Sequence, residues 1–474
     1  MEEEKIFKGL WFLPNNPERK LNGVLTFRPF EAHSELELFG HIDYYAENNE
    51  FEIIHGTTFD DKIITLHKCI VVYFSGFSDK DSPENKKPSK ILVSFIFKGI
   101  HFANSSDLVF KNIQANIFNL EHWVNIDGFS NISNSVTMGG DEISNFNYNR
   151  PKSIEFKIDD KFDGAINFNL SPNFDDFYTK QYRFTQDTSL EINSVEHITF
   201  SELLDKVYIF QNFIVSSLFV NLYHFNITLK SDEYNYVSRG MGDLKIPIPI
   251  ELFIGNQKNF QSKKPKKHFD MFFTYDDMEL HFPEIIKKWY SKYNELSYSF
   301  NLFFSSFYTN DNYIDGMFLN LMQATEAFHY HLNLDKKLLD ENEWKARKKE
   351  LKENLSPELY SWISSQLSNN YYLGKRLDEL IANYTTDLVI EKIGDVPKFL
   401  TNLKNTRNYL THYNPELKKK SLKGIELVQA YRLLRMILIC AFYIECGFDK
   451  NFLDSQIRLK GHKFFGLITP KKAT

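Results

Sequence analysis

The hydrophobic period differs between the front and the back of the chain, and this difference limits the possible folds more than any other feature. Up to about residue 200, apolar side chains recur at every second position, as in residues 154–158 and 166–170. After Pro283 they recur at three- and four-residue steps, as in the run from Ile314 to Phe328. Period two is typical of a half-buried strand, and steps of three and four are typical of a helix. We therefore predict an α+β fold with a β-rich front and an all-α back.

The β-rich part is expected to span residues 1–280. Turn clusters such as Pro14-Asn-Asn-Pro17 separate many short predicted strands, which favours an antiparallel sandwich or a barrel-like module. One interruption is predicted, because Thr199-Phe-Ser-Glu202 fits a capping box and a helix of about 20 residues can follow at 200–223. Residues 281–474 form the second predicted domain. Short polar links there favour an up-and-down bundle of helices at 314–328, 338–354, 357–367, 375–384, 397–413 and 422–446.

Charge is unevenly distributed between these two parts. The whole chain has a formal net charge of −6, yet residues 311–474 hold 25 Lys and Arg against 20 Asp and Glu. The first 310 residues hold the other 31 basic and 42 acidic side chains. A basic surface attracts RNA, because neutralised phosphates release their counterions. The excess of positive charge in the back is also compatible with ordinary surface variation.

Composition favours a cytoplasmic protein without a membrane span. Cys69, Cys440 and Cys446 are too few for a disulfide scaffold and have no metal-ligand spacing. The acidic start Met-Glu-Glu-Glu-Lys lacks the apolar stretch of an export signal. Residues 207–228 and 433–444 are apolar but carry polar interruptions or are too short for a span of about 20 residues. We expect both segments to be buried core helices.

The segment that carries candidate chemistry is 400–415, which contains Arg407, Asn408 and His412. Asn408 and His412 are four residues apart and share a helix face, whereas Arg407 and His412 lie about 140° apart around an ideal helix. Pro415 disfavours helical geometry at the residue before it, so the helix is expected to end close to His412. A long arginine side chain at such an end can reach the pocket of the histidine.

These residue types suit RNA cleavage, because RNA carries its own nucleophile in the ribose 2′-hydroxyl. Histidine titrates near neutrality and can act as base or acid. Arginine is always charged and its fork matches phosphate oxygens, while asparagine can orient either group. This route requires no metal ion and no cofactor. The alternative is that His412 only caps the C-terminus of its helix, where a partly positive ring suits the helix dipole.

Basic and aromatic neighbours could bind the RNA. Lys418, Lys419 and Lys420 follow the motif by six residues, and Lys404 precedes it on the same predicted helix. Tyr413 could stack on a base, although core packing is its alternative. A second basic run at 345–349 could also line an RNA path, although such runs are usually solvated faces.

The motif Arg407-Asn408-Tyr-Leu-Thr-His412 resembles the Arg-x4–6-His signature of the HEPN superfamily. The stretch 318–329, which contains Glu326, resembles the early HEPN helix. The front resembles the N-terminal domain of ApeA-type anti-phage proteins. The matching stretches are 9–14, 22–27, 54–58 and 64–66.

The resemblance implies a metal-independent HEPN endoribonuclease in abortive anti-phage defence, with a sensing or regulatory N-terminal part. It implies that two protomers pair, so that Arg407 and His412 of both form one composite site. Arg407 would bind phosphate, His412 would act as general base or acid, Asn408 would support them and Glu326 would orient Arg407. The implied target is structured cellular RNA such as tRNA, and the implied trigger is a phage-encoded protein.

Two rivals remain open from the sequence. The first is a HEPN module without catalysis that binds nucleotide or acts as a scaffold. The second is an interaction protein whose β-rich front binds a partner or a glycan. Substitution of Arg407 or His412 distinguishes both rivals from the nuclease hypothesis, because only a nuclease depends on these side chains for RNA cleavage.

Overall fold

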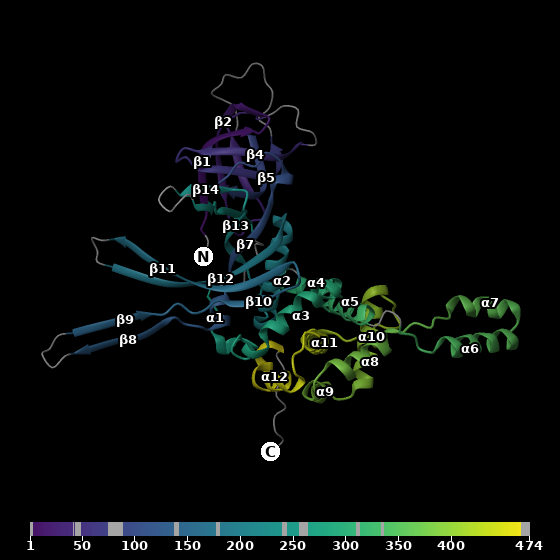
Figure 1. The fold of residues 1–474 in the computed structure, drawn as a ribbon. Helices are drawn as coiled ribbons and strands as arrows, with labels where there is room; N and C mark the ends of the chain where they lie inside the picture. Colours follow the sequence, from purple (N-terminus) through teal and green to yellow (C-terminus); the bar gives the residue numbers. More distant parts are fainter. Residues whose placement is uncertain are drawn as a thin grey trace. The chain divides into compact units, whose positions relative to one another are not determined.

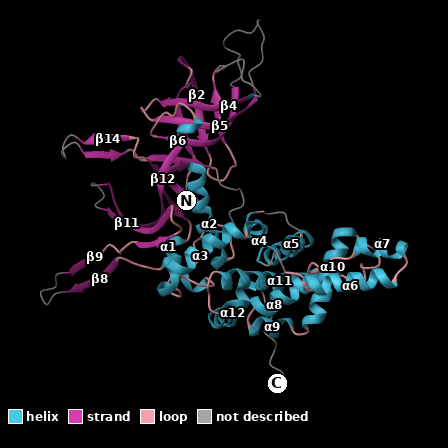
Figure 2. Ribbon diagram, turned by 45° about the vertical axis from the view of Figure 1, so that its right-hand side comes forward, coloured by secondary structure: helices cyan, strands magenta, loops and turns pink. Residues whose placement is uncertain are grey.

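The structure is a computed structural model that describes residues 3–40, 42, 49–73, 89–136, 142–176, 181–238, 244–255, 264–309, 313–332 and 336–465. The chain divides into two compact units, Met1–Tyr290 and Ser291–Thr474. All described strands lie in the first unit, and helices make up the second (Figures 1 and 2). The prediction of an α+β fold with a β-rich front and a helical back is therefore confirmed.

A closed antiparallel barrel forms the first part of the N-terminal unit. Its strands follow the order β6-β3-β2-β1-β4-β5, and β5 pairs with β6 again, which closes the ring. Closure leaves no free edge among these six strands, which removes a template for edge-to-edge aggregation. The strands are β1 (Lys5–Leu13), β2 (Asn16–Phe27), β3 (Ser34–Leu38), β4 (Glu50–Thr58), β5 (Ile63–Tyr73) and β6 (Ser89–Lys98).

Trp11 fills the barrel core because two glycines leave space for its ring. Trp11 is fully buried and pairs in register with Gly56 on β4. A Cβ atom at Gly56 would lie 2.3 Å from the indole, and one at Gly23 would lie 2.8 Å from it. The three residues belong to three of the stretches that resemble an ApeA-type front, so packing around Trp11 explains why these segments need their glycines.

The sheet continues past the barrel as an open antiparallel layer. From β6 outward the order is β16 (Ile250–Ile254), β13 (His224–Lys230), β7 (Val109–Ile117), β12 (Gln181–Thr199), β11 (Phe162–Asp176) and β10 (Ile154–Lys157). Helix α2 (Phe200–Leu218) packs against β12 and β7. Smaller elements complete the unit, namely α1 (Leu120–Val124), the hairpin β8 (Phe129–Val136) with β9 (Glu142–Tyr148), and the hairpin β14 (Asn235–Ser238) with β15 (Leu244–Pro247).

Helix α2 differs in two details from its prediction. Thr199 Oγ1 accepts the amide of Glu202 at 3.3 Å, but the Glu202 carboxylate lies 3.4 Å from the same hydroxyl. The carboxylate thus contacts the Thr199 hydroxyl, and half of the capping box is formed. The helix ends at Leu218 rather than near Tyr223, because Phe219 adopts a left-handed conformation with φ of 54°.

Helices form the second unit, and α11 contributes a long, largely buried stretch to its core. Helix α11 packs against α5, α8, α9 and α12. It is the single helix in the described ranges that is long and apolar enough to cross a membrane, and 67 % of its most apolar window is buried. The helices are α3 (Phe282–Glu295), which crosses the unit boundary, α4 (Ser297–Tyr308), α5 (Ile314–Leu332), α6 (Glu341–Asn354), α7 (Pro357–Gln366), α8 (Leu373–Tyr384), α9 (Asp387–Ile393), α10 (Val396–His412), α11 (Gly424–Glu445) and α12 (Lys450–Phe465).

Helices α6 and α7 form a hairpin that extends away from the other helices of this unit (Figure 1). Neither helix contains a buried residue. The two ends of the hairpin meet where Lys337 bridges to Asn370. The hairpin therefore adds surface to the unit without adding to its core.

Candidate functional site

Helix α10 carries the predicted motif, and local signals explain where it begins and ends. The Asp395 side chain accepts the amide of Lys398 at 2.9 Å and so caps the first turn. The helix ends at His412, since Tyr413 adopts a left-handed conformation with φ of 50°. The prediction that the helix ends close to His412 is confirmed. Its buried stripe consists of Phe399, Leu403, Thr406 and Leu410.

The side of α10 opposite this stripe forms a polar face. At about 100° per residue, Arg407 and His412 mark its two borders, about 140° apart. Lys404, Asn408 and Thr411 project between these borders by the same arithmetic. Lys404, Thr411 and His412 are exposed, whereas Arg407 and Asn408 are half-buried. We call these five residues the α10 polar face.

Arg407 is held on one border of this face by two neighbours. Its Nη2 atom lies 3.6 Å from Glu326 Oε1 on α5, and its Nη1 donates to Asn408 Oδ1 at 3.2 Å. Glu326 Oε1 is buried and has no hydrogen-bond partner within the described ranges. Glu326 Oε1 can therefore still accept a hydrogen bond close to the guanidinium. The structure brings Arg407, Asn408 and Glu326 together, while the orienting role of Glu326 stays a prediction.

His412 makes no hydrogen bond and no ion pair with these three residues within the described ranges. Its side chain is exposed, and among the described residues it has no hydrogen bond and no ion pair, including with Arg407. A single chain therefore presents one open imidazole beside one tethered guanidinium. The reach of Arg407 into the pocket of His412 stays a prediction.

The segment after α10, residues 413–423, contains the predicted RNA-binding lysines, and we call it the lysine strap. Lys418, Lys419 and Lys420 are exposed and have no ion-pair partner in the part of the chain that the structure describes. Tyr413 is 68 % exposed and contacts Tyr409 edge to face, so stacking on a base remains open to it.

Sequence reasoning missed one contact of the lysine strap. The amide of Leu422 donates to Thr406 Oγ1 at 2.9 Å. In the sequence, Thr406 occupies a position of the apolar stripe of α10, which indicates core packing rather than a contact to a loop. The one available signal was that Thr406 is the single polar residue of that stripe.

The second basic run, residues 345–349, lies on α6 and is largely neutralised. Three of its cations pair one turn away with glutamates of the same helix. The pairs are Lys345 with Glu341 at 3.2 Å, Arg347 with Glu343 at 2.7 Å and Lys349 with Glu353 at 3.8 Å. This pattern supports the interpretation of a solvated face, which the sequence left open for this run.

A separate polar cluster lies around Glu379 on α8. Glu379 accepts from His329 Nε2 at 3.0 Å, Lys336 Nζ at 3.0 Å and Tyr371 OH at 3.1 Å. Burial lowers the pKa of His329 despite the neighbouring carboxylate. Burial raises the pKa of Glu379, but its three donors outweigh this effect and lower it overall. The cluster fastens both ends of the α6–α7 hairpin to the bundle through α5 and α8.

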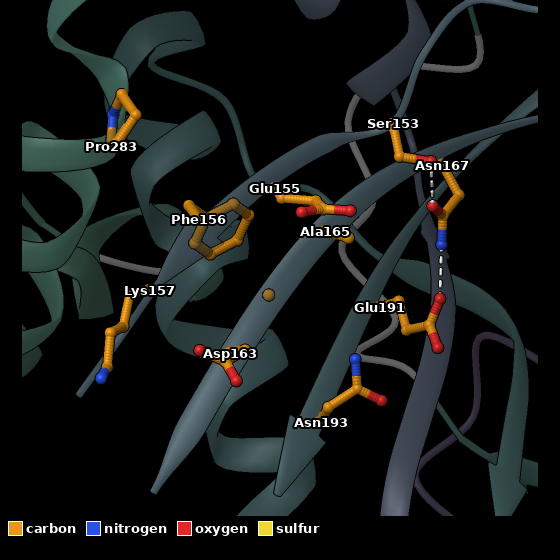
Figure 3. Close-up of a pocket in the computed structure, with 11 residues that line it drawn as sticks. Ser153, Glu155, Phe156, Lys157, Asp163, Ala165, Asn167, Glu191, Asn193 and Pro283 are labelled. Atoms are coloured by element: carbon orange, nitrogen blue, oxygen red, sulfur yellow. Dashed lines mark hydrogen bonds between the residues drawn. The ribbon is translucent and has the colours of Figure 1, made fainter. Parts of the chain in front are cut away.

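The N-terminal unit offers a hollow of about 640 Å³ over β10, β11 and β12 (Figure 3). Glu155, Asp163 and Glu191 make its lining acidic. The Asn167 amide donates to Glu191, and the Ser153 hydroxyl donates to Asn167. The Ser153 hydroxyl in the hollow thus bonds to an amide, and not to a base that could activate it. The hollow is therefore a weaker candidate for chemistry than the α10 polar face.

Comparisons with known proteins match both units. The family model "ApeA N-terminal domain 1" matches residues 6–289, which is more than half of the chain. The family model "Apea-like HEPN" matches residues 319–452. No curated protein and no solved structure matches the chain. The second match contains Glu326 on α5 together with Arg407 and His412 on α10.

Proposed function

Since the chain belongs to the ApeA family of HEPN-type defence proteins, we propose that it is an endoribonuclease that acts in anti-phage defence. In this proposal residues 281–474 cut RNA, and residues 1–280 sense infection and restrain the cut. The α10 polar face carries the proposal, because one helix end presents a guanidinium, an amide and an open imidazole.

The chemistry follows from these three groups. A base removes the proton of the ribose 2′-hydroxyl, whose oxygen then attacks the adjacent phosphorus. The bond from phosphorus to the 5′-oxygen breaks, and an acid protonates that oxygen. His412 is the proposed base or acid. Arg407 stabilises the charge that develops on the phosphate, and Asn408 holds the guanidinium through its amide oxygen.

A second copy of the chain would supply the second imidazole, so that one can act as base and the other as acid. One imidazole cannot perform both roles in the same step, whereas two imidazoles related by a two-fold axis can. A two-fold interface uses the same surface on both subunits, so two α10 polar faces would meet across it. The exposure of His412, without a partner in the described ranges, supports a site that is completed by another protomer.

We infer from the family that the substrate is structured cellular RNA, with tRNA as the first candidate. The exposed lysines at 418–420 together with Lys404 would bind its phosphates, and Tyr413 would stack on a base. Loss of tRNA stops growth and phage production together. A phage-encoded protein would be the trigger, and the cytoplasm the place of action.

The test is to incubate the purified full chain with total RNA in the presence of EDTA. Specific fragments that end in 2′,3′-cyclic phosphate are expected. His412→Ala should lower kcat at least about 100-fold, which is the usual contribution of a general acid or base. Arg407→Ala should cause a loss of at least about 100-fold as well, because it removes a donor that stabilises the charge on the phosphate. His462→Ala is the matched control, since His462 is also an exposed histidine at the end of a helix.

A HEPN module without catalysis predicts a different outcome in the same experiment. It would bind RNA or nucleotide without producing fragments, and defence against phage would survive both alanine substitutions. Cleavage that persists unchanged in Arg407→Ala and His412→Ala would overturn the nuclease proposal for this site.

A further inference from the structure

We propose that Thr406 is a positioning residue whose hydroxyl holds the lysine strap against α10, the helix that carries Arg407 and His412. The inference rests on the proposed function, because it assigns a role to Thr406 in presenting Lys418, Lys419 and Lys420 to RNA. Thr406 itself is fully buried and touches no substrate. It therefore acts through the strap.

The Thr406 hydroxyl makes two hydrogen bonds, and they connect two different segments. Its Oγ1 donates to the carbonyl of Asn402 at 2.7 Å, one turn back on α10. The same oxygen accepts the amide of Leu422 at 2.9 Å. A hydroxyl has one donor and two acceptor positions, so both bonds can form together. Without the hydroxyl, the Leu422 amide would lose its acceptor in a half-buried place.

This contact fixes the direction of the lysine strap. The strap leaves α10 at Tyr413 and returns to Thr406, seven residues earlier on the helix, which is about 10 Å along its axis. Arg407 and His412 lie within this same length of α10. The strap therefore runs back along the two turns of α10 that carry Arg407 and His412, on the side of the helix that holds Thr406.

The lysine strap is also folded within itself. The amide of Leu417 donates to the Asn414 carbonyl at 3.0 Å, and the amide of Lys420 donates to the Leu417 carbonyl at 2.9 Å. The buried Ser421 donates its hydroxyl to the Lys418 carbonyl at 3.1 Å. These turns keep the three lysines close to one another. The Thr406 contact then attaches this compact segment to the helix of the motif.

Fixed lysines bind phosphates at a lower entropic cost than lysines on a loose loop. Each lysine that contacts a phosphate also adds about one to the slope of log affinity against log salt. Release of the strap should therefore weaken RNA binding and flatten its salt dependence. The chemical step at Arg407 and His412 should change little.

Thr406→Val removes the hydroxyl and keeps the branched shape. Thr401→Val is the matched control, because Thr401 Oγ1 makes the same type of bond to the Pro397 carbonyl at 2.9 Å and has no hydrogen bond to the strap among the described residues. Thr406→Ser restores a hydroxyl at the same position. The substrate is a purified tRNA pool, and kcat, KM and the salt dependence of KM are measured for each full-length variant.

The expected result is that Thr406→Val raises KM about fivefold, the value of one ordinary hydrogen bond, with kcat nearly unchanged. Thr406→Ser and Thr401→Val should resemble the wild type. In a background where Lys418, Lys419 and Lys420 are all alanine, Thr406→Val should add no further increase in KM. Equal KM values for Thr406→Val and Thr401→Val, or a further increase in the alanine background, would overturn the proposal.

Two further outcomes are separable. If the wild type does not cleave tRNA or total RNA, the proposed function fails, and the role of Thr406 fails with it. If Thr406→Val does not fold, Ser421→Ala replaces it, because this change loosens the strap from its own side. Ser421→Ala should then raise KM and flatten the salt dependence, and a wild-type KM in this variant would overturn the proposal.

Discussion

The ion pair of Glu326 with Arg407 is expected to matter more for the proposed chemistry than for stability. Their side chains are 25 % and 31 % exposed and their charged atoms lie 3.6 Å apart. Partly exposed pairs of this kind contribute less than about 1 kcal/mol to stability. In the proposed site, the pair would limit the positions that the guanidinium can adopt beside the phosphate.

Glu326→Gln is therefore expected to lower RNA cleavage while leaving the unfolding free energy within about 1 kcal/mol of the wild type. The loss of activity should be smaller than in Arg407→Ala, because the guanidinium is still present. Glu343→Gln provides the control, since it breaks a closer ion pair on α6, far from the motif in sequence. RNA cleavage rates measure the loss of activity, and urea denaturation curves measure the unfolding free energy. A wild-type rate in Glu326→Gln would remove Glu326 from the site.

His224 is expected to make the N-terminal unit sensitive to acid. His224 lies on β13 and contacts α2 through Gln211, and its burial lowers its pKa to about 4, from 6.5 in the unfolded chain. Between these pH values the unfolded state binds more protons than the folded state. The unfolding free energy should therefore fall as the pH drops from 6.5 towards 4, by about 3 kcal/mol in total from this residue.

His224→Asn should remove this part of the pH dependence, because asparagine does not titrate and its amide can still donate to Gln211 Oε1, which lies 2.9 Å from His224 Nδ1. Urea denaturation of the N-terminal unit at pH 7 and pH 4.5 provides the measurement. The variant should lose less stability between the two pH values than the wild type. Equal losses would show that other groups cause the acid sensitivity.

The α6–α7 hairpin is an element whose removal should be tolerated. Neither helix has a buried residue, and the chain enters and leaves where Lys337 meets Asn370. Replacement of residues 341–366 by a short Gly-Ser linker should leave the bundle folded. The KM for RNA should also be unchanged, because the basic run on α6 is paired with its own glutamates. Calorimetry and cleavage kinetics of the deletion variant test this, and a large rise in KM would assign the hairpin to RNA contact.

Elements with a clear local pattern could be predicted from the sequence. Strands β10 and β11 follow the alternation of residues 154–158 and 166–170, and α10 follows its apolar stripe and ends before Pro415. The pairing of β5 with β6 that closes the barrel could not be predicted, because strand register between distant segments depends on packing of the whole sheet. The contact of Thr406 could not be predicted for a related reason. Its hydroxyl accepts the amide of Leu422 only after the chain has folded back onto α10.

At the scale of the whole molecule, the fold separates a barrel-and-sheet unit from a helical unit. The helical unit contains every residue of the candidate site, yet it supplies one imidazole per chain. The proposed cleavage therefore makes an oligomer part of the catalyst rather than a later addition. Concentration should then matter for activity, because dissociated chains would bind RNA without cutting it.

Subunit mixing tests this two-fold site most directly. Wild-type chains and His412→Ala chains are co-expressed in equal amounts with different tags, so that dimers form at random, and the RNA cleavage rate is measured at constant total protein. A site that needs His412 from both chains predicts about one quarter of the wild-type rate, because about one quarter of random dimers are wild type in both halves. A rate of about one half, in proportion to the wild-type chains present, would show that each chain cuts alone and would contradict the composite site.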